Sequence, residues 1–353
     1  MASLLDQWAE RIRAAAADGR ALCLRGGGSK DFYGGAPRGE AFDTRGHAGI
    51  VAYEPTELYV TARCGTPLAE LEAVLAAKGQ FLAFEPPRFS GATVGGMVAA
   101  GLSGPRRAAA GAVRDFVLGV KLIDGEGRVL SFGGQVMKNV AGYDLSRLVA
   151  GSMGCLGLIA EVSLKVLPKS VAEATLRFEM PQANALEALN AWGGKPLPVT
   201  ASCWQAGLLT LRLSGARAAV QAARGKLGGE VLGDAEAAAF WEARREMSDA
   251  FFAGPEPLWR LSVPSVAPVL DEAQSVEWGG AQRWWRSGRP AAELRALVAS
   301  AGGHATLFRR GGRGDDVFPF HPPAPAILGL HRRLKEAFDP KGILNPGRLM
   351  ADL

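Results

Sequence analysis

The chain has 353 residues, of which 48% are hydrophobic and 21% are charged, and its formal net charge is +5. This length is enough for two domains with separate cores, and the balance excludes a disordered or collagen-like chain. The 46 glycines are an excess, which indicates many positions where the backbone needs positive φ or a close approach. Basic residues are scattered along the whole chain, which argues against a nucleic-acid-binding protein.

The four cysteines, Cys23, Cys64, Cys155 and Cys203, lie far apart and form no CxxC pair. This spacing argues against a disulfide framework, a zinc site and an iron–sulfur cluster. The first eighteen residues carry charges at helical spacing, and no apolar run reaches the length of a membrane span. We therefore expect a cytoplasmic protein, or one held at a membrane only through partner subunits.

Strands and glycine-rich loops alternate in the first half of the chain. An amphipathic helix over Leu4–Ala17 precedes a strand over Ala21–Arg25. Further strands are expected at 49–53, 58–63, 116–123, 128–132 and 158–166, with a helix that starts at Thr66 and stops at Gly79. Asp124-Gly125-Glu126-Gly127 predicts a hairpin. Glu85–Gly111 favours neither helix nor strand, and we place a domain boundary at Pro168.

The pattern changes after Pro168 to a β-α-β-β-α-β series. Its elements are expected at 172–179, 182–192, 199–204, 208–213, 215–227 and 230–232. A helix over 234–249 leads to a second, similar series at 258–262, 265–273, 276–278, 281–286, 290–301 and 304–308. These series predict two ferredoxin-like halves that form one antiparallel sheet covered by helices. A loop over 311–325, a helix over 327–338 and a turn-rich tail complete the chain.

Three glycine-rich loops contain candidate binding residues. In Arg25-Gly26-Gly27-Gly28-Ser29-Lys30, bare amides, a hydroxyl and two cations suit a diphosphate, although a flexible surface turn has the same composition. The spacing differs from the Rossmann fingerprint, and no Walker motif occurs. Ala92-Thr93-Val94-Gly95-Gly96-Met97 adds a hydroxyl and two more amides, and Gly151–Gly157 opens into an apolar strand. One long ligand with an anionic middle, such as a flavin dinucleotide, would use all three loops.

These loops carry a resemblance to a known family. Residues 21–168 resemble the flavin-binding domain of the vanillyl-alcohol oxidase/p-cresol methylhydroxylase (PCMH/VAO) family, with Arg25–Ser29 as its pyrophosphate loop, Ala92–Gly96 as its second loop and Gly151–Ile159 as its third. The tail Phe338–Gly347 resembles the end of the D-2-hydroxyacid dehydrogenase and glycolate oxidase branch, where it folds back on the flavin domain. Met137–Leu145 and the total length resemble the shorter type of FAD-binding subunit in bacterial glycolate oxidases.

The resemblance implies an α+β fold: a two-part PCMH-type FAD-binding domain at 1–168, a cap domain with an antiparallel sheet at 169–325, and a C-terminal helix and tail at 326–353. It also implies FAD held without a covalent bond, since His47 lies in no attachment motif. The implied cofactor-binding residues are Arg25, Gly26, Gly27, Gly28, Ser29, Lys30, Pro86, Thr93, Val94, Gly95, Gly96, Gly104, Gly154, Gly157, Ile159 and Asn345.

The cap departs from that of catalytic relatives. Oxidation of a 2-hydroxy acid needs a base for the hydroxyl proton and a cation for the carboxylate. Larger relatives supply a histidine cluster, whereas here Gly314-Asp315-Asp316 follows His304 without a second histidine at metal spacing, so we expect no metal site. His304 is a candidate base or a surface histidine. Arg283, Arg286, Arg309 and Arg310 could bind a carboxylate or be solvated, and Trp284-Trp285 is expected to be core.

The resemblance implies an oxidoreductase: the FAD-binding subunit of a glycolate oxidase complex that oxidises glycolate to glyoxylate. Electrons would pass to an iron–sulfur subunit and to quinone, and the main catalytic base would belong to a larger flavoprotein subunit. Two alternatives remain open. One is a self-sufficient FAD-dependent D-2-hydroxy-acid dehydrogenase that uses His304, and the other is an assembly subunit without a cofactor.

Overall fold

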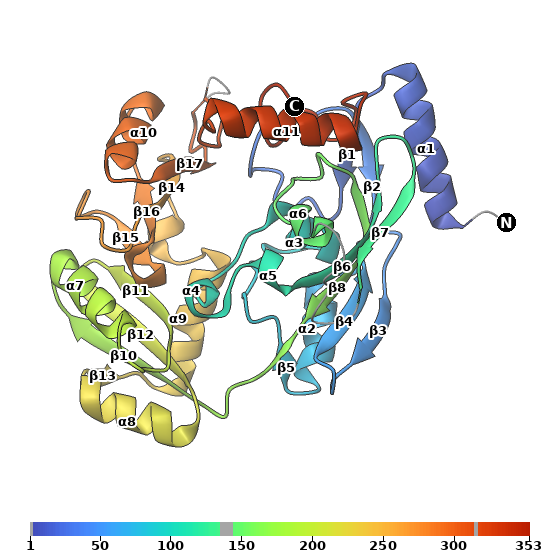
Figure 1. Ribbon diagram of the computed structural model, residues 1–353. Coiled ribbons are helices and arrows are strands. Elements are labelled where there is room, and N and C mark those ends of the chain that lie inside the picture. The colour runs from blue at the N-terminus through green and yellow to red at the C-terminus, as the bar shows by residue number, and fades with distance from the viewer. Residues whose placement is uncertain (1–2, 135–143, 314–316) are drawn as a thin grey trace.

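The computed structural model describes residues 3–134, 144–313 and 317–353. Met137–Tyr143, which carry part of the resemblance, and Gly314–Asp316 lie outside these residues. Two main sheets organise the chain, one of five strands and one of eight. Figure 1 shows the five-stranded sheet with the N-terminal helix on one side and the eight-stranded sheet on the other.

The N-terminal helix and the first strand form as the sequence predicts, whereas the strand that pairs with the first was not expected. Helix α1 (Leu4–Asp18) starts with a capping box between Ser3 and Asp6 and buries Ile12 against the sheet. Strand β1 (Leu22–Arg25) follows and pairs in parallel with β2 (Glu40–Asp43). The C-terminal tail bridges to the same strand, Leu344 beside Leu22, so both ends of the chain meet at β1.

The five-stranded sheet has the order β3-β4-β8-β6-β7 and is antiparallel throughout. Its strands are β3 (Ile50–Glu54), β4 (Tyr59–Arg63), β6 (Val117–Ile123), β7 (Val129–Gly133) and β8 (Leu158–Lys165). The predicted hairpin is confirmed: buried Asp124 accepts hydrogen bonds from the amides of Glu126 and Arg128 in the turn between β6 and β7. Helix α2 (Leu68–Ala76) buries Leu68, Leu71 and Leu75 in the core of this sheet. A short pair, β5 (Gln80–Phe81) and β9 (Leu167–Pro168), lies beside it.

The expectation that Glu85–Gly111 lacks regular structure is wrong. It contains α3 (Val94–Ala100) and α4 (Arg107–Ala110), and α5 (Val113–Phe116) follows directly. The Thr93 side chain caps α3 by accepting from the Gly96 amide, and buried Val94 and Met97 attach the helix to the core. Capping and burial outweigh the low helix propensity of the two glycines in its first turn.

The eight-stranded antiparallel sheet has the order β13-β10-β12-β11-β15-β16-β14-β17. The first half comprises β10 (Ala172–Glu179), α7 (Gln182–Gly193), β11 (Val199–Gln205), β12 (Leu208–Gly215), α8 (Arg217–Leu227) and β13 (Glu230–Val231). After α9 (Asp234–Glu246), the second half comprises β14 (Leu258–Ser262), β15 (Ser275–Glu277), β16 (Gln282–Arg286), α10 (Ala291–Ser300) and β17 (His304–Arg309). Both halves have the ferredoxin-like strand order, and the antiparallel edges of β11 and β15 join them into the one sheet that the sequence predicts.

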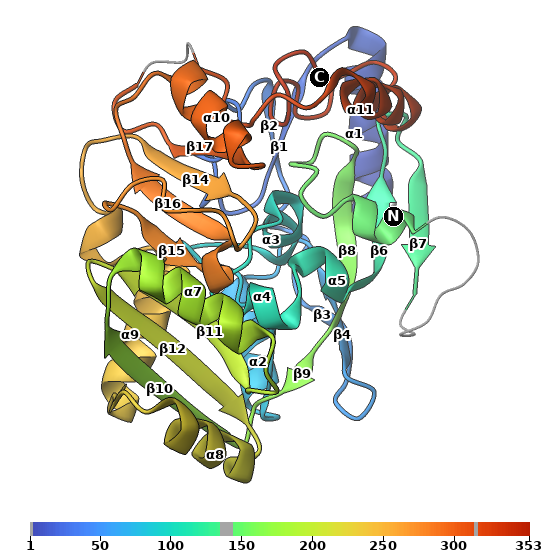
Figure 2. The same cartoon turned by 60° about the vertical axis from the view of Figure 1, so that its left-hand side comes forward.

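The helix predicted over 265–273 does not form. The guanidinium of Arg283, which is completely buried, donates to the carbonyl oxygens of Ala267, Pro268 and Gly280. The arginine competes with helical amides for these carbonyls, and Pro268 lacks an amide donor and disfavours the helical conformation at Ala267 before it. The second half of the sheet therefore keeps its strand order but has a loop in place of its first helix (Figure 2).

Helix α11 (Pro325–Phe338) lies across the top of the molecule in Figure 1 and leads into the tail beside β1. Its buried residue is Lys335, whose ammonium donates to Asp339 Oδ2 at 2.7 Å and to the carbonyls of Cys155 and Leu344. The carboxylate of Asp339 in turn accepts from the Leu344 amide at 2.7 Å. This buried cluster fixes the tail against the turn that precedes β8.

Candidate cofactor site

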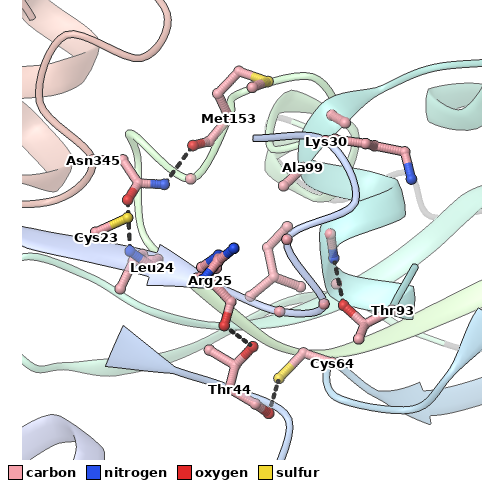
Figure 3. Close-up of a pocket in the computed structure, with 18 of the residues that line it drawn as sticks. Cys23, Leu24, Arg25, Lys30, Thr44, Cys64, Thr93, Ala99, Met153 and Asn345 are labelled. Atoms are coloured by element: carbon pink, nitrogen blue, oxygen red, sulfur yellow. Dashed lines mark hydrogen bonds between the residues drawn. The ribbon is translucent and has the colours of Figure 1, made fainter. Parts of the chain in front are cut away.

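A pocket opens where the loop after β1, helix α3, the turn before β8 and the C-terminal tail meet (Figure 3). Thirteen of the sixteen residues expected at the cofactor lie in its wall: Arg25, Gly26, Gly27, Gly28, Ser29, Lys30, Thr93, Gly95, Gly96, Gly154, Gly157, Ile159 and Asn345. The three loops come from positions far apart in the sequence, and the fold gathers them around one cavity.

The loop Gly26–Lys30 has the backbone that binding of a diphosphate requires. Within the described parts of the chain, the amides of Gly27, Gly28, Ser29 and Lys30 donate to no protein acceptor. Four consecutive open amides at a pocket wall are an anion-binding arrangement. Arg25 stands beside them and pairs with Asp31 at 2.6 Å.

Gly27 is required by packing between two loops. A Cβ atom there would overlap the carbonyl oxygen of Gly91. The sequence pattern favoured a glycine left bare for a ligand, whereas the structure shows that another segment of the chain already occupies the space beside its α-carbon. A larger residue at position 27 would therefore separate the two loops that form the pocket.

The second loop offers fewer free amide donors than the sequence predicted. The Gly95 amide donates to the carbonyl of Cys64 at 2.9 Å, and the Gly96 amide faces Thr93 Oγ1 at 3.4 Å. These amides are partnered within the protein, so the expectation of two bare donors is wrong. A Cβ atom at Gly95 would lie 2.7 Å from Cys64 Cβ. A glycine is therefore needed here because α3 packs closely against the residue that follows β4.

Asn345 lines the pocket, but its side chain bonds to the protein. Its Oδ1 accepts from the Leu24 amide at 2.6 Å, and its Nδ2 donates to the Met153 carbonyl at 2.7 Å (Figure 3). One side chain from the tail thus joins β1 to the third loop. We assign Asn345 a positioning role in the wall.

Three expected residues lie outside the pocket wall. Val94 is fully buried in the core of the five-stranded sheet. The Pro86 carbonyl accepts from Arg245 Nε at 2.9 Å, and the Gly104 carbonyl accepts from Trp278 Nε1 at 3.1 Å. The segments around residues 86 and 104 therefore bind α9 and the turn between β15 and β16, which places them at the contact between the two sheets.

Lys30 is the most deeply buried cation in the first loop, with 8% of its surface exposed. Its ammonium lies 3.4 Å from Ser29 Oγ and 5.3 Å from the centre of the Phe89 ring. Burial lowers the pKa of Lys30 to about 8, and the nearby Glu246 carboxylate opposes that shift only in part.

His304 does not reach this pocket. It lies exposed at the start of β17, with its ring centre 6.2 Å from that of His321.

The cap arginines considered for a substrate carboxylate bind backbone carbonyls instead. Arg286 and Arg309 both donate to the Phe252 carbonyl at 3.3 Å, and Arg310 donates to that of Val317 at 3.1 Å. Trp284 and Trp285 are buried, as expected. Across the described residues, no group of three or more His, Cys, Asp or Glu side chains is placed to hold a metal.

Sequence reasoning missed several wall residues, among them Cys23, Thr44, Cys64, Met153 and Arg348. Arg348 matters most, because its buried guanidinium donates to the carbonyls of Lys30, Asp31 and Gly35. The sequence could have indicated Arg348 as a pocket residue, because it lies three residues after Asn345 in the tail that was expected to return to the FAD-binding domain. Nothing in the sequence marked Thr44 or Cys64 as pocket residues, since each only comes directly after a strand.

The residues present fit an FAD. The open amides of Gly27–Lys30, with Arg25, Lys30 and Arg348 close by, suit the diphosphate in its middle. Leu24, Leu158 and Ile159 supply apolar wall for a flat ring. When bound, FAD supplies two-electron redox chemistry. The chain supplies the cavity, the orienting loops and the positive charge.

The comparisons with known proteins agree with this geometry. Residues 3–133 match the family model of an FAD binding domain, and residues 324–349 match that of the C-terminal domain of FAD linked oxidases. The chain is 46% identical over 347 residues to "Glycolate oxidase subunit GlcE" of Escherichia coli (strain K12), covering 98% of this chain and 97% of that protein. It is 31% identical to "Glycolate oxidase subunit GlcD" of Bacillus subtilis (strain 168), over 43% of this chain and 33% of that one.

A solved structure of p-cresol methylhydroxylase with substrate bound superimposes with a TM-score of 0.71 at 14% identity, over 99% of this chain and 88% of that one. This likeness confirms the expected PCMH/VAO-type α+β fold. With the identity to a glycolate oxidase subunit over nearly the full length, the chain is an FAD-linked oxidoreductase of that fold. Within this class it belongs to the family of the glycolate oxidase subunit GlcE.

Proposed function

We propose that this chain is the FAD-binding subunit of a glycolate oxidase complex that oxidises glycolate to glyoxylate. The observation that carries the proposal is the 46% identity to a glycolate oxidase subunit over nearly the full length of both chains. The pocket supports it, because three loops and the tail converge on a cavity suited to a dinucleotide. FAD would be held there by backbone donors and packing, without a covalent bond.

The partners proposed are a larger flavoprotein subunit, which supplies the catalytic base, and an iron–sulfur subunit that passes electrons to quinone. The distribution of side chains supports this division of labour. His304 lies away from the pocket, and the cap arginines bind backbone carbonyls. None of the described helices combines the length and hydropathy needed to cross a bilayer. We propose a cytoplasmic complex, with any contact with the membrane made by partner subunits.

We also propose the division of the chain into a FAD-binding domain at 1–168, a cap at 169–325 and a returning helix and tail at 326–353. The arrangement of the sheets supports it, because every strand of the five-stranded sheet precedes Pro168 and every strand of the eight-stranded sheet follows it.

The test compares the purified chain alone with the chain co-expressed with both partner subunits. We expect the isolated chain to be yellow and unable to reduce a dye with glycolate, and the complex to turn over. Gly96→Leu should fill the pocket and yield a colourless subunit that still assembles but gives an inactive complex. Turnover by the isolated chain would establish a self-sufficient dehydrogenase. An active complex that contains colourless Gly96→Leu would establish an assembly role.

A further inference from the structure

Lys30 carries a buried charge that forms no ion pair with any described residue, and the Glu246 carboxylate offsets its burial only in part. Only 8% of the residue is exposed, and this burial disfavours the charged form of the side chain. Its contacts are Ser29 Oγ at 3.4 Å and the Phe89 ring at 5.3 Å, and within the described residues no carboxylate oxygen pairs with it. A buried ammonium without an anionic partner costs several kcal/mol.

The charged groups around Lys30 are already engaged. Glu246, on α9, accepts from the amide of Phe89 at 2.9 Å and from the amide and Nε of Arg88. Asp31, one residue further along the loop, pairs with Arg25. The neighbouring cation Arg245 binds the Pro86 carbonyl and the Glu72 carboxylate and adds positive potential at Lys30. Arg348 donates to the backbone carbonyl of Lys30. None of these groups forms an ion pair with the Lys30 ammonium, and Glu246 offsets its burial only in part.

The position of Lys30 in the fold identifies which group could neutralise its charge. It ends the loop whose amides are open and lies in the wall of the pocket, with its side chain running toward α3 (Figure 3). A ligand bound in this pocket is therefore the available source of negative charge. FAD offers two: its diphosphate, and its ring system, which gains negative charge on reduction.

Building on the proposed function, we propose that the bound cofactor supplies the counter-ion of Lys30, so that a negative charge of FAD and this ammonium stabilise each other and ligand binding is coupled to the protonation of Lys30. The glycine loop then contributes more than geometry. It carries a side chain that is costly in the empty site and favourable in the filled one.

The sign of the coupling follows from linkage. Burial lowers the pKa of Lys30 to about 8 in the chain without ligand, and a negative charge nearby would raise it. Affinity is then greatest below that value and falls as pH rises through it, by roughly tenfold per pH unit until the pKa of the complex is reached. Above pH 8, each ligand bound should take up nearly one proton.

Isothermal titration of the full chain, stripped of flavin, with FAD between pH 7 and 9.5 tests this proposal. Buffers of different ionisation enthalpy report proton uptake directly. Lys30→Met should bind FAD more weakly at pH 7 and lose both the proton uptake and the fall in affinity, while Lys30→Arg keeps the affinity at all pH values. Lys195→Met, which removes an exposed lysine of the cap, should behave as wild type. A melting curve for each variant establishes that it is folded.

ADP and riboflavin separate the two sources of charge. Proton uptake with ADP but not with riboflavin assigns the diphosphate. Proton uptake with reduced FAD but not with oxidised FAD, combined with a lower midpoint potential of the flavin in Lys30→Met, assigns the reduced ring. A flat pH dependence for both redox states would overturn the proposed coupling. Equal affinities, pH profiles and potentials for wild type and Lys30→Met would overturn the proposal while leaving the FAD site intact. Failure of the wild-type chain to bind FAD at all would refute the proposed function itself.

Discussion

The side-chain Oδ1 of Asn345 accepts a hydrogen bond from the backbone amide of Leu24, 321 residues earlier in the chain, at 2.6 Å. Through Nδ2 the same amide group holds the Met153 carbonyl at 2.7 Å. These two hydrogen bonds therefore link the first loop to the third loop through the tail and set the distance between them. The pocket has its shape because the last residues of the chain return to the first strand.

Replacing Asn345 should weaken this link between the two loops. Asn345→Ala leaves the Leu24 amide and the Met153 carbonyl without their partner, and unsatisfied buried backbone groups cost about 1–3 kcal/mol each. We expect a lower melting temperature and a larger proportional loss of FAD affinity, measured by thermal unfolding and by fluorescence titration. Lys341→Ala, at an exposed site in the same tail, is the control. An Asn345→Ala chain with unchanged FAD affinity would contradict this link.

The ion pair between Lys335 and Asp339 should be more costly to break. Both side chains are buried, with 7% and 0% of their side-chain surface exposed. Removing one partner leaves an uncompensated buried charge, which costs about 3–5 kcal/mol. Chemical denaturation of Lys335→Met should show a loss in that range. A loss below about 1 kcal/mol would mean that the tail contributes little to stability.

Two glycine variants separate packing from ligand contact. Gly27→Val would push the first loop away from Gly91, so both folding and FAD retention should suffer. Gly96 is different, because a Cβ there meets only Thr93 Oγ1, at 3.2 Å, and leucine favours a helix over glycine by roughly 1 kcal/mol. Gly96→Leu should keep its melting temperature and lose FAD, as shown by the visible spectrum of the purified chain. A yellow Gly96→Leu protein would place the cofactor elsewhere.

Glu85 should make stability depend on acid pH. Burial alone would raise the pKa of this carboxyl, but the guanidinium groups of Arg212 and Arg106 outweigh burial and hold the pKa below its ordinary value. Because the folded-state pKa is the lower one, the stabilisation is present above the ordinary value of 4.5 and is lost as pH falls through the folded pKa. Urea unfolding of Glu85→Gln should show lower stability at pH 7 and a smaller further loss in acid. An acid profile identical to that of wild type would refute this role.

The sequence predicted most strands closely, because apolar alternation and turn residues are local signals. Strand β10 (Ala172–Glu179) is found where it was expected. The sequence misled where tertiary contacts decide the structure. Helix α3 depends on the Thr93 cap and on burial of Val94, and the loop in place of the predicted 265–273 helix depends on Arg283, which comes from a later strand. Thr93 and Pro268 are local signals, but the burial of Val94 and the contacts of Arg283 depend on distant parts of the chain.

The candidate site shows the same division. Glycine runs and a resemblance located the three loops, which the fold brings to one pocket. They did not show which amides the protein itself occupies: those of Gly27–Lys30 are open, whereas that of Gly95 donates to Cys64. Arg348 was missed because its role depends on the tail returning to the first loop. Sequence patterns placed the binding surface, and its usable donors required the hydrogen-bond network.

The central claim is that this chain alone holds FAD without a covalent bond. An absorption spectrum of the purified recombinant chain, followed by heat denaturation, tests it most directly. We predict a flavin spectrum near one equivalent per chain and release of all the colour into the supernatant. Colour that remains with the precipitate would contradict the non-covalent site, and a folded, colourless chain that does not take up added FAD would contradict the site itself.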